Sequence, residues 1–480
     1  MKDGKGKKKV QFFSDIKSIL HDNVYINKVP SYGNTIFYSF GFILITLFLL
    51  LAISGTLMAF FTQPWWLTSS LGIYVRSVHM WAAQAFMLFL VLHLFVTFST
   101  SAFRKKKAVW LAGAIMLFIF VVETELGYGL RGDFSTQWRA LQGADFWNGN
   151  PLGSVLNMLN YSQVFSIHVL IIPLTVLVLI ALHYGIVRKR GLSKPYRKGV
   201  KYKMVEASHK SLYLRASIVV AVVLILGFLV QSPFVPPVTV QQISQQQPDV
   251  FAQTLVQEFN YTSDTATYQN TVDPYTFSTR NVFVIQPYEE FISVHGGKDL
   301  IPVFNAENSS VQNQNINGAM DYFSGNGTIN LSENANPLIP VMSSLVVMGQ
   351  SGLYDAKMKA DLTGDNPTYE ERILSDTGYM DEKADGLGLS LENYGMIKDE
   401  AGGGILPPNS WWMAPFNILD NTILANDPNQ DRDGGEIVGL VMLILATLPW
   451  IPYFNRIPDW LGLYKIFWKT EKKKGKSRKK

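Results

Sequence analysis

The chain has 480 residues, of which 48% are hydrophobic and 16% charged, with a formal net charge of +5 and no cysteine. The missing cysteine excludes disulfides, cysteine-ligated iron–sulfur clusters, cysteine-ligated zinc and thioether-linked haem on this chain. The small net charge is the sum of separate basic and acidic regions. Because the basic segments alternate along the chain as a membrane topology requires, we interpret them as topology signals and expect no nucleic-acid partner.

Six apolar runs are long enough to cross a bilayer, because about 20 residues at about 1.5 Å rise each span the roughly 30 Å hydrocarbon core. They cover residues 35–60, 75–98, 109–126, 164–187, 212–230 and 437–454. The first follows a basic, partly polar stretch without a small-residue cleavage site, so we expect a retained span. The sequence therefore predicts an integral membrane protein with an all-α transmembrane fold.

The loops between these runs alternate between strongly and weakly basic sequence. The basic set is the N-terminus KDGKGKKKV, the loops FRKKKAVW and VRKRGLSKPYRKGVKYK, and the tail KTEKKKGKSRKK. Because short cytoplasmic loops carry an excess of lysine and arginine, we expect this set inside the cell. This pattern predicts a multi-pass protein of the cell membrane with both termini in the cytoplasm.

A polar, acidic segment of 204 residues, 232–435, separates the fifth and sixth runs. It is long enough for a folded domain, and the topology places it outside the cell. It is rich in Asn, Gln, Ser, Thr and Gly and lacks sustained helical periodicity, which favours a mainly β or mixed fold. Four sequons make it a candidate for glycosylation, at Asn260, Asn308, Asn326 and Asn330.

We therefore expect five parts along the chain. They are a cytoplasmic N-terminal segment (1–34), a four-helix domain (35–190), a cytoplasmic loop with the fifth transmembrane helix (191–231), the extracytoplasmic insert (232–435), and a last part (436–480). The last part holds the sixth transmembrane helix, an amphipathic interfacial helix and a basic cytoplasmic tail.

The second and fourth runs each contain two histidines, His79 with His93 and His168 with His183. At about 100° per residue, a fourteen-residue step returns to within about 40° of its starting direction, and a fifteen-residue step to within about 60°. The same steps advance about 21 and 22.5 Å along the helix axis. Each helix therefore presents two histidines on one face, one near each side of the membrane.

Both runs cross in the same direction, which sets how the histidines pair. We expect His79 and His168 near the outer surface, and His93 and His183 near the inner one. Two b-type haems stacked across the membrane, each held axially by one such pair, suit this arrangement. Two alternatives remain open: a hydrogen-bonding role in the core for a lone intramembrane histidine, and zinc. Ligand pairs about 21 Å apart suit a large planar cofactor better than a compact tetrahedral ion.

Glycines repeat the same interval in the first and third runs, at Gly41 and Gly55 and at Gly113 and Gly127. Glycine lets a backbone approach closely, which the edge of a flat macrocycle needs at two depths, although glycine also serves ordinary helix packing. Arg76, three residues before His79, is expected to pair with haem propionates or to snorkel to the outer interface.

Three segments together resemble a known family: RSVHMWAAQAFMLFLVLHLF, GYGLRGDFSTQW and FSIHVLIIPLTVLVLIALHYGIVRKRG. They are similar to cytochrome b of the quinol-oxidising cytochrome bc complexes, over residues 29–190 and more loosely from 212 onward. The histidines, glycines, Arg76 and Pro173 fall at the family's relative positions, and the insert lies outside the resemblance. The fifteen-residue interval from His168 to His183 is similar to the photosynthetic branch. The sequons, the acidic insert and the missing cysteines favour an archaeal-type respiratory member from an acidic environment.

The resemblance implies a four-helix dihaem bundle with two further transmembrane helices, acting as a quinol oxidoreductase subunit. It implies that quinol is oxidised near the outer face. One electron would pass to a Rieske iron–sulfur protein, and the other through the outer haem (His79, His168) and the inner haem (His93, His183) to an inner quinone site. This is a proton-translocating Q cycle. Implied partners are the Rieske protein, a terminal oxidase or other electron acceptor, a second copy of the chain in a dimer, and membrane subunits that supply the family's remaining helices.

The outer quinol site departs from the family pattern. After the third span the family reads Gly-Tyr-x-Leu-Pro-Trp, whereas here Tyr128 is followed by GLRG, with Trp138 retained. The family's Pro-Glu-Trp-Tyr signature is matched by LPPNSWWMAPFNIL, which contributes Pro408, Asn409 and Trp411 but no glutamate. An amide or hydroxyl cannot act as a general base at ordinary pH. The resemblance then leaves three carboxylates, or a water chain, to take the quinol proton: Asp133, Glu436 and Asp420. The tryptophans could instead form an interfacial aromatic belt.

Three positions concern the inner side. Ser39 stands where photosynthetic members carry the cysteine that attaches a third haem, so we expect that haem to be absent. Glu206 and His209 lie in the neighbourhood of the family's inner quinone site, as quinone ligands or as ordinary loop residues.

Two other functions remain open. One is a dihaem membrane anchor that relays electrons between a peripheral oxidoreductase and the quinone pool, which the altered outer segments allow. The other makes the acidic insert a receptor or adhesion module on a membrane stem, which leaves the histidine and glycine spacing unexplained.

Overall fold

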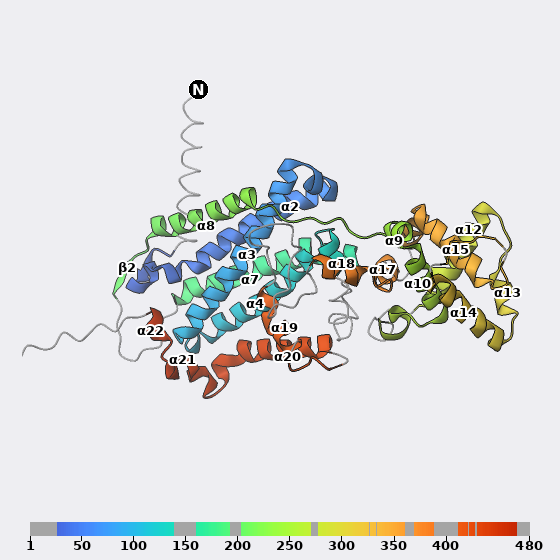
Figure 1. Ribbon diagram of the computed structural model, residues 1–480. Helices are drawn as coiled ribbons and strands as arrows, with labels where there is room; N and C mark the ends of the chain where they lie inside the picture. The colour runs from blue at the N-terminus through green and yellow to red at the C-terminus, as the bar shows by residue number, and fades with distance from the viewer. Residues whose placement is uncertain are drawn as a thin grey trace, which may run out of the picture. The chain divides into compact units, whose positions relative to one another are not determined.

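The computed structural model describes residues 26–138, 160–192, 203–269, 277–325, 327–332, 334–360, 369–387, 411–420, 422–427 and 430–467. The chain forms two compact units, whose elements are labelled in Figure 1. The first, which we call the membrane unit, comprises Met1–Val122, Val169–Ser232 and Leu440–Lys480. The second, which we call the insert unit, comprises Glu123–His168 and Pro233–Gly439.

Among the described residues, six helices are long and apolar enough to cross a membrane, which confirms the prediction of six spans. The spans are Phe40–Thr62, Ser70–Ser99, Lys107–Tyr128, Tyr161–Lys189, His209–Leu229 and Asp433–Trp450. They belong to α2 (Phe40–Thr68), α3 (Ser70–Ser99), α4 (Lys107–Tyr128), α6 (Tyr161–Ser166) with η4 (Ile167–Ile171) and α7 (Ile172–Arg190), α8 (His209–Leu229) and α20 (Gln430–Thr447). A helix satisfies all its backbone groups internally, which is why such apolar runs adopt it.

In the membrane unit, α2, α3 and α8 pack together (Figure 1). The connection from α2 to α3 is tight: Thr62 has a positive φ of 65°, and Pro64 follows it within α2. Ser69 caps α3 by accepting a hydrogen bond from the backbone N–H of Gly72. A side chain at Gly72 would collide with the backbone of Trp65, so this turn requires glycine.

The fourth span contains a π-helical turn, η4, that includes His168. Pro173 stands at the start of α7 and has no N–H to donate to the preceding turn. A hydrogen bond from residue i to i+5 encloses one residue more than the α-helical bond, so η4 absorbs one residue. The fifteen-residue interval from His168 to His183 therefore corresponds to fourteen in a regular helix, the interval from His79 to His93.

A two-stranded antiparallel sheet joins the residues before the first span to those before the fifth. Strand β1 (Lys28–Pro30) pairs with β2 (Met204–Glu206). The Asn34 side chain extends this link, because it donates to the carbonyl of Glu206 and accepts from the backbone N–H of Ser208.

All regular elements among the described residues of the insert are helices, so the prediction of a mainly β or mixed fold was wrong for this part of the chain. Its elements are α9 (Val240–Gln246), α10 (Pro248–Asn260), η5 (Thr265–Gln269), η6 (Arg280–Ile285), α12 (Gln286–His295), α13 (Ile301–Asn305), α14 (Ser309–Ser324), α15 (Leu338–Gln350), α16 (Leu353–Ala360), α17 (Tyr369–Ser375), α18 (Tyr379–Leu387), η8 (Trp411–Met413) and α19 (Ala414–Asp420).

Two features of the sequence hid these helices. Most are short, and polar residues that suggested turns are helix caps: Thr239 caps α9 and Asn308 caps α14. The central helix α15 is apolar nearly all round and buried along most of its length, so it has no amphipathic periodicity.

The core of the insert unit also takes residues from the loop after α4. Phe134 is fully buried in this core and Trp138 packs against it. The backbone N–H of Phe134 donates to the carbonyl of Val235, and the Gln137 amide makes two hydrogen bonds with the backbone of Val238. This loop is therefore part of the insert unit, which the division at residue 232 did not anticipate.

The chain after the sixth span forms short helices and not the single interfacial helix that we expected. Among the residues described there are η9 (Leu448–Trp450), η10 (Phe454–Arg456), α21 (Ile457–Trp460) and α22 (Tyr464–Phe467). Gly462, with a φ of 65°, breaks the helix between α21 and α22. Asp459 anchors this segment to the loop after α3, where it pairs with Arg104 at 2.5 Å and accepts from the Ser101 hydroxyl.

Candidate functional site

Each of the four predicted histidine ligands lies against a glycine of another helix. A Cβ atom at Gly55 would lie 3.1 Å from Cε1 of His79, and one at Gly41 would lie 3.7 Å from Cε1 of His93. On the other pair of helices, the corresponding distances are 2.8 Å from Gly127 to His168 and 3.6 Å from Gly113 to His183. The glycines therefore face the imidazole rings themselves, and the contact is closest at the two positions predicted to be outer.

The Nδ1 atom of His79 is held by a serine that sequence reasoning missed. The Ser54 hydroxyl lies 2.9 Å from this nitrogen and also lies 2.8 Å from the carbonyl of Leu50. Because the hydroxyl has one proton, which the carbonyl takes, it accepts from Nδ1–H of His79. This leaves the lone pair of Nε2 available to a metal.

The Nδ1 atom of His168 also faces acceptor oxygens, both of them from Glu123. It lies 3.1 Å from the backbone carbonyl of Glu123 and 3.3 Å from the carboxylate Oε1 of the same residue. His168 therefore carries its proton on Nδ1 and presents Nε2 as an unprotonated ligand.

The two histidines predicted to be inner have a different setting. His93 and His183 lie within electrostatic range of each other. Nδ1 of His183 is buried and makes no hydrogen bond to the part of the chain that the structure describes, although the carbonyl of Val109 lies near this imidazole.

The residues present fit axial ligation of haem by imidazole, in which Nε2 binds iron and the protein holds Nδ1. Each of the four rings is half-buried and is faced by a residue without a side chain. Zinc usually takes three or four protein ligands. Among the described residues, no group of three or more His, Asp or Glu side chains could hold a metal ion.

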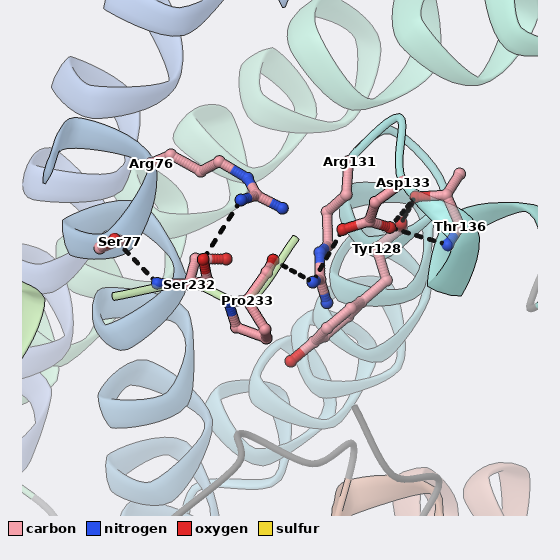
Figure 2. Close-up of polar contacts among 8 residues, drawn as sticks. All are labelled: Arg76, Ser77, Tyr128, Arg131, Asp133, Thr136, Ser232 and Pro233. Carbon is pink, nitrogen blue, oxygen red and sulfur yellow. Dashed lines mark hydrogen bonds and ion pairs between the residues drawn. The ribbon is translucent and has the colours of Figure 1, made fainter. Parts of the chain in front are cut away.

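Arg76 is buried and does not snorkel to the surface. Its guanidinium donates to the carbonyl of Ser232 at 3.3 Å (Figure 2). The guanidinium also lies over the ring of Trp66. The backbone N–H of Ser232 donates in turn to the hydroxyl of Ser77. Arg76 thus contacts the chain that leaves the fifth span.

At the end of the third span, Tyr128 and a tryptophan of the segment after residue 410 come together. The ring of Tyr128 lies 6.1 Å from that of Trp412, whose neighbour Trp411 packs against it at 5.7 Å. The indole N–H of Trp412 donates to Oε1 of Glu125 at 2.7 Å. Pro408 and Asn409 lie outside the described residues, and Trp138 belongs to the core of the insert unit.

Of the three carboxylates considered for the quinol proton, Asp133 is fully buried, and its oxygens already have hydrogen-bond and ion-pair partners. It pairs with Arg131 at 2.8 Å and accepts from the backbone and the hydroxyl of Thr136 (Figure 2). Arg131 also donates to the carbonyl of Pro233. Such contacts make Asp133 a structural group. Glu436 is exposed on α20, and the side chain of Asp420 lies outside the described residues.

The two inner-side candidates lie on successive elements, at the end of β2 and the start of α8. Glu206 is an exposed residue of β2, and His209 is the half-buried first residue of α8. A nearby buried residue, Ser39, instead accepts a hydrogen bond of 2.6 Å from Arg215, which also donates to the carbonyl of Asn34.

A family model described as cytochrome b(N-terminal)/b6/petB matches residues 84–242, which include His93, His168 and His183. Over this range the chain is similar to the cytochrome b/b6 N-terminal family. It is 29% identical over 208 residues to cytochrome b6 of Heterocapsa triquetra, covering 38% of this chain and 94% of that protein. It is also 29% identical over 199 residues to cytochrome b6 of Mastigocladus laminosus, covering 37% of this chain and 92% of that protein. A chain of a structure titled "Hyperthermophilic respiratory Complex III" aligns with a TM-score of 0.36 at 16% identity, over 75% of this chain and 97% of that one.

Two glutamates of the third span were missed by sequence reasoning, although a signal was available. Glu123 and Glu125 both lie in the third span, where an ionisable residue is a functional candidate by default because its burial in a membrane is costly. Each contacts a residue already in the predicted sites, His168 and Trp412 respectively. Ser54 carried no such signal, because a serine in an apolar helix commonly bonds to its own backbone.

Proposed function

We propose that this chain is the cytochrome b subunit of a respiratory quinol-oxidising complex that performs a proton-translocating Q cycle. The family is that of an electron-carrying membrane subunit, and the observation that carries the finer proposal is the set of four histidine–glycine contacts. Glycine at four separate helix positions, each facing an imidazole, is difficult to explain by helix packing alone.

His79 and His168 would hold an outer haem b, and His93 and His183 an inner one. When bound, the two haems would supply one-electron carriers at two depths of the membrane. The contribution of the chain is to fix two of the rings: Ser54 and Glu123 hold the Nδ1 proton of His79 and His168, which would leave Nε2 unprotonated for a metal.

Quinol gives up two protons as it is oxidised, so the outer site needs a base within hydrogen-bonding reach. We assign this role to Glu125. Its carboxylate is oriented by the indole N–H of Trp412, and it lies three residues before Tyr128, the site residue retained from the family pattern. Glu125 would thus replace the missing signature glutamate, and Asp133 would keep the adjacent loop in place.

The proposal includes a Rieske iron–sulfur protein as the acceptor of one electron, a terminal oxidase or other final acceptor, a dimer, and further membrane subunits. It places the protein in the cell membrane with both termini in the cytoplasm and the insert outside. Asn308 is an exposed residue of the insert and caps α14, which makes it the most accessible of the described sequons.

The test is a pyridine haemochrome assay on the purified chain, which gives haem type and haem per polypeptide. We expect two haem b, and one in each of the four variants in which a ligand histidine is replaced by alanine. His295→Ala, which changes an exposed histidine of the insert, is the matched control and should keep both. Two haems in His168→Ala would contradict the assignment.

A second candidate function is a dihaem anchor for a peripheral oxidoreductase. The ion pair between Arg131 and Asp133, which occupies the position of the family's Leu-Pro-Trp segment, favours it. Purification under mild conditions separates the two: a co-purifying Rieske protein supports the first, and a peripheral dehydrogenase the second.

A further inference from the structure

Glu123 and Gly127 hold the ring of His168 from two successive turns of α4. They are four residues apart, so they lie on one face of the helix. Gly127 leaves room for the Cε1 edge of the ring, and the backbone carbonyl and carboxylate of Glu123 both face Nδ1. The orientation of this one histidine is therefore set from a single helix face.

Apart from His168, few groups offset the cost of burying the Glu123 carboxylate. Its side chain is 17% exposed, and Oε2 is buried without a hydrogen-bond partner among the described residues. A buried charge is costly unless it is paired. The His168 N–H is the partner identified at 3.3 Å, so the two groups form one electrostatic unit.

The other ligand histidines differ in this respect. His79 meets the neutral hydroxyl of Ser54, and Nδ1 of His183 makes no hydrogen bond to the described residues. A carboxylate that accepts from Nδ1–H increases the electron donation of the imidazole and stabilises the higher charge of a ligated metal. Since all four proposed ligands are imidazoles, the two haems can differ in potential only through the hydrogen-bonding partners and the burial of these rings.

We propose that Glu123 is a positioning residue that fixes the tautomer of His168 and lowers the reduction potential of the haem that His168 ligates. This inference rests on the bis-histidine ligation proposed above. Glu123 acts through His168 and does not itself touch the cofactor or the quinol.

The experiment compares redox titrations of the two haems, followed by their visible absorbance, in the purified full-length protein and its variants. Glu123→Gln keeps a hydrogen-bond acceptor of nearly the same shape and removes the charge. We expect it to retain two haems and to shift one of the two titration waves to higher potential while the other stays in place. Glu125→Gln, which removes a carboxylate two residues away on the same helix, is the control and should leave both waves close to their wild-type positions.

Retention of both haems in Glu123→Gln with neither wave moved, or with a shift no larger than that of Glu125→Gln, would overturn the inference. If Glu123→Gln loses a haem, Glu123→Asp decides. A retained haem with an unshifted wave then supports a role for the charge, and loss of the haem with aspartate as well overturns it. Failure of the underlying ligation would look different, because the wild-type protein would then hold fewer than two haems or His168→Ala would hold both.

Discussion

The transmembrane helices and the insert bury ionisable side chains in different ways. In the third span, two half-buried glutamates each contact a residue of the candidate sites: Glu123 contacts His168 and Glu125 contacts Trp412. In the insert, carboxyl groups are buried against one another. Glu258 is fully buried and faces Asp376, with the Ser263 hydroxyl donating to the first and the backbone N–H of Thr265 to the second.

The consequence for the insert is that its carboxyls hold protons unusually tightly. Burial raises the pKa of Glu258 well above its ordinary value, and the neighbouring Asp376 adds to this. Burial likewise raises the pKa of Glu371 to about 7, assisted by Glu370, whose own pKa burial raises to about 7 although Lys359 pairs with it. The folded insert is therefore favoured at low pH, where these carboxyls are protonated, whereas the sites in the spans depend on ring contacts.

The difference can first be tested in the spans, by filling the space in front of a ring. Gly127→Ala would place a methyl group 2.8 Å from Cε1 of His168, which an intact ring position cannot accommodate. We expect the haem content to fall from two per chain to one, because overpacking typically costs about 1–3 kcal/mol and moves the ligand. Gly41→Ala, where the distance is 3.7 Å, should keep both haems in the same haemochrome assay. Equal haem contents in the two variants would show that the space provided by Gly127 is not required to position the His168 ring.

The outer site can be tested by removing its candidate base. We expect Glu125→Gln to lower kcat for quinol oxidation about a hundredfold, the lower range for loss of a general base. Haem content should stay at two, since Glu125 contacts Trp412 and no ligand histidine. Steady-state quinol oxidation with the Rieske partner is the measurement, and Glu436→Gln, on the exposed face of α20, is the matched control. Unchanged turnover would exclude Glu125 as the proton acceptor.

The buried carboxyl of Glu371 predicts that the stability of the insert depends on pH. The folded-state pKa of Glu371 is raised, so folded protein binds the proton more tightly than unfolded protein. Its stabilising effect is complete below about pH 4.5, falls as the pH rises, and is lost by about pH 7. The shift corresponds to about 3 kcal/mol. Calorimetry of the full chain in detergent should therefore show an insert transition that melts earlier at pH 7.5 than at pH 4.5.

Glu371→Gln should flatten this dependence, because glutamine does not titrate. Glu290→Gln is the matched control, since Glu290 is half exposed in an ion pair with Lys357 and should leave the slope unchanged. If the melting temperature of the insert depends on pH equally in the wild type and both variants, Glu371 is not the cause of the dependence.

The smallest expected effect concerns a neutral hydrogen bond in the insert core. The buried hydroxyl of Tyr354 donates to the carbonyl of Phe283 at 2.8 Å. Tyr354→Phe removes the donor and should lower the free energy of unfolding of the insert by about 1 kcal/mol, with no effect on haem content or potential. Denaturant unfolding of the purified chain measures it, and a change in haem content would contradict the prediction.

Much of the membrane part could be predicted from the sequence. Hydrophobic length fixed the six spans, because an apolar run of about 20 residues has few ways to satisfy its backbone in a bilayer. Helical periodicity alone indicated that each pair of histidines and each pair of glycines lies on one helix face. The structure then brings each histidine against a glycine. The fifteen-residue interval on the fourth span is the exception, because the π-helical turn at His168 depends on Pro173 in its local context.

What only the tertiary structure decided is which polar groups meet. Glu123 reaches His168 from 45 residues away and Glu125 reaches Trp412 from 287 residues away, and no local pattern carries that information. The helical fold of the insert was hidden for a related reason. Its central helix α15 is apolar on every side because it is surrounded, and its surroundings are built from segments far apart in the sequence. Amphipathic periodicity identifies a helix that has one face toward solvent, so it fails where a helix has neighbours on all sides. The spans were recognised instead by their apolar length.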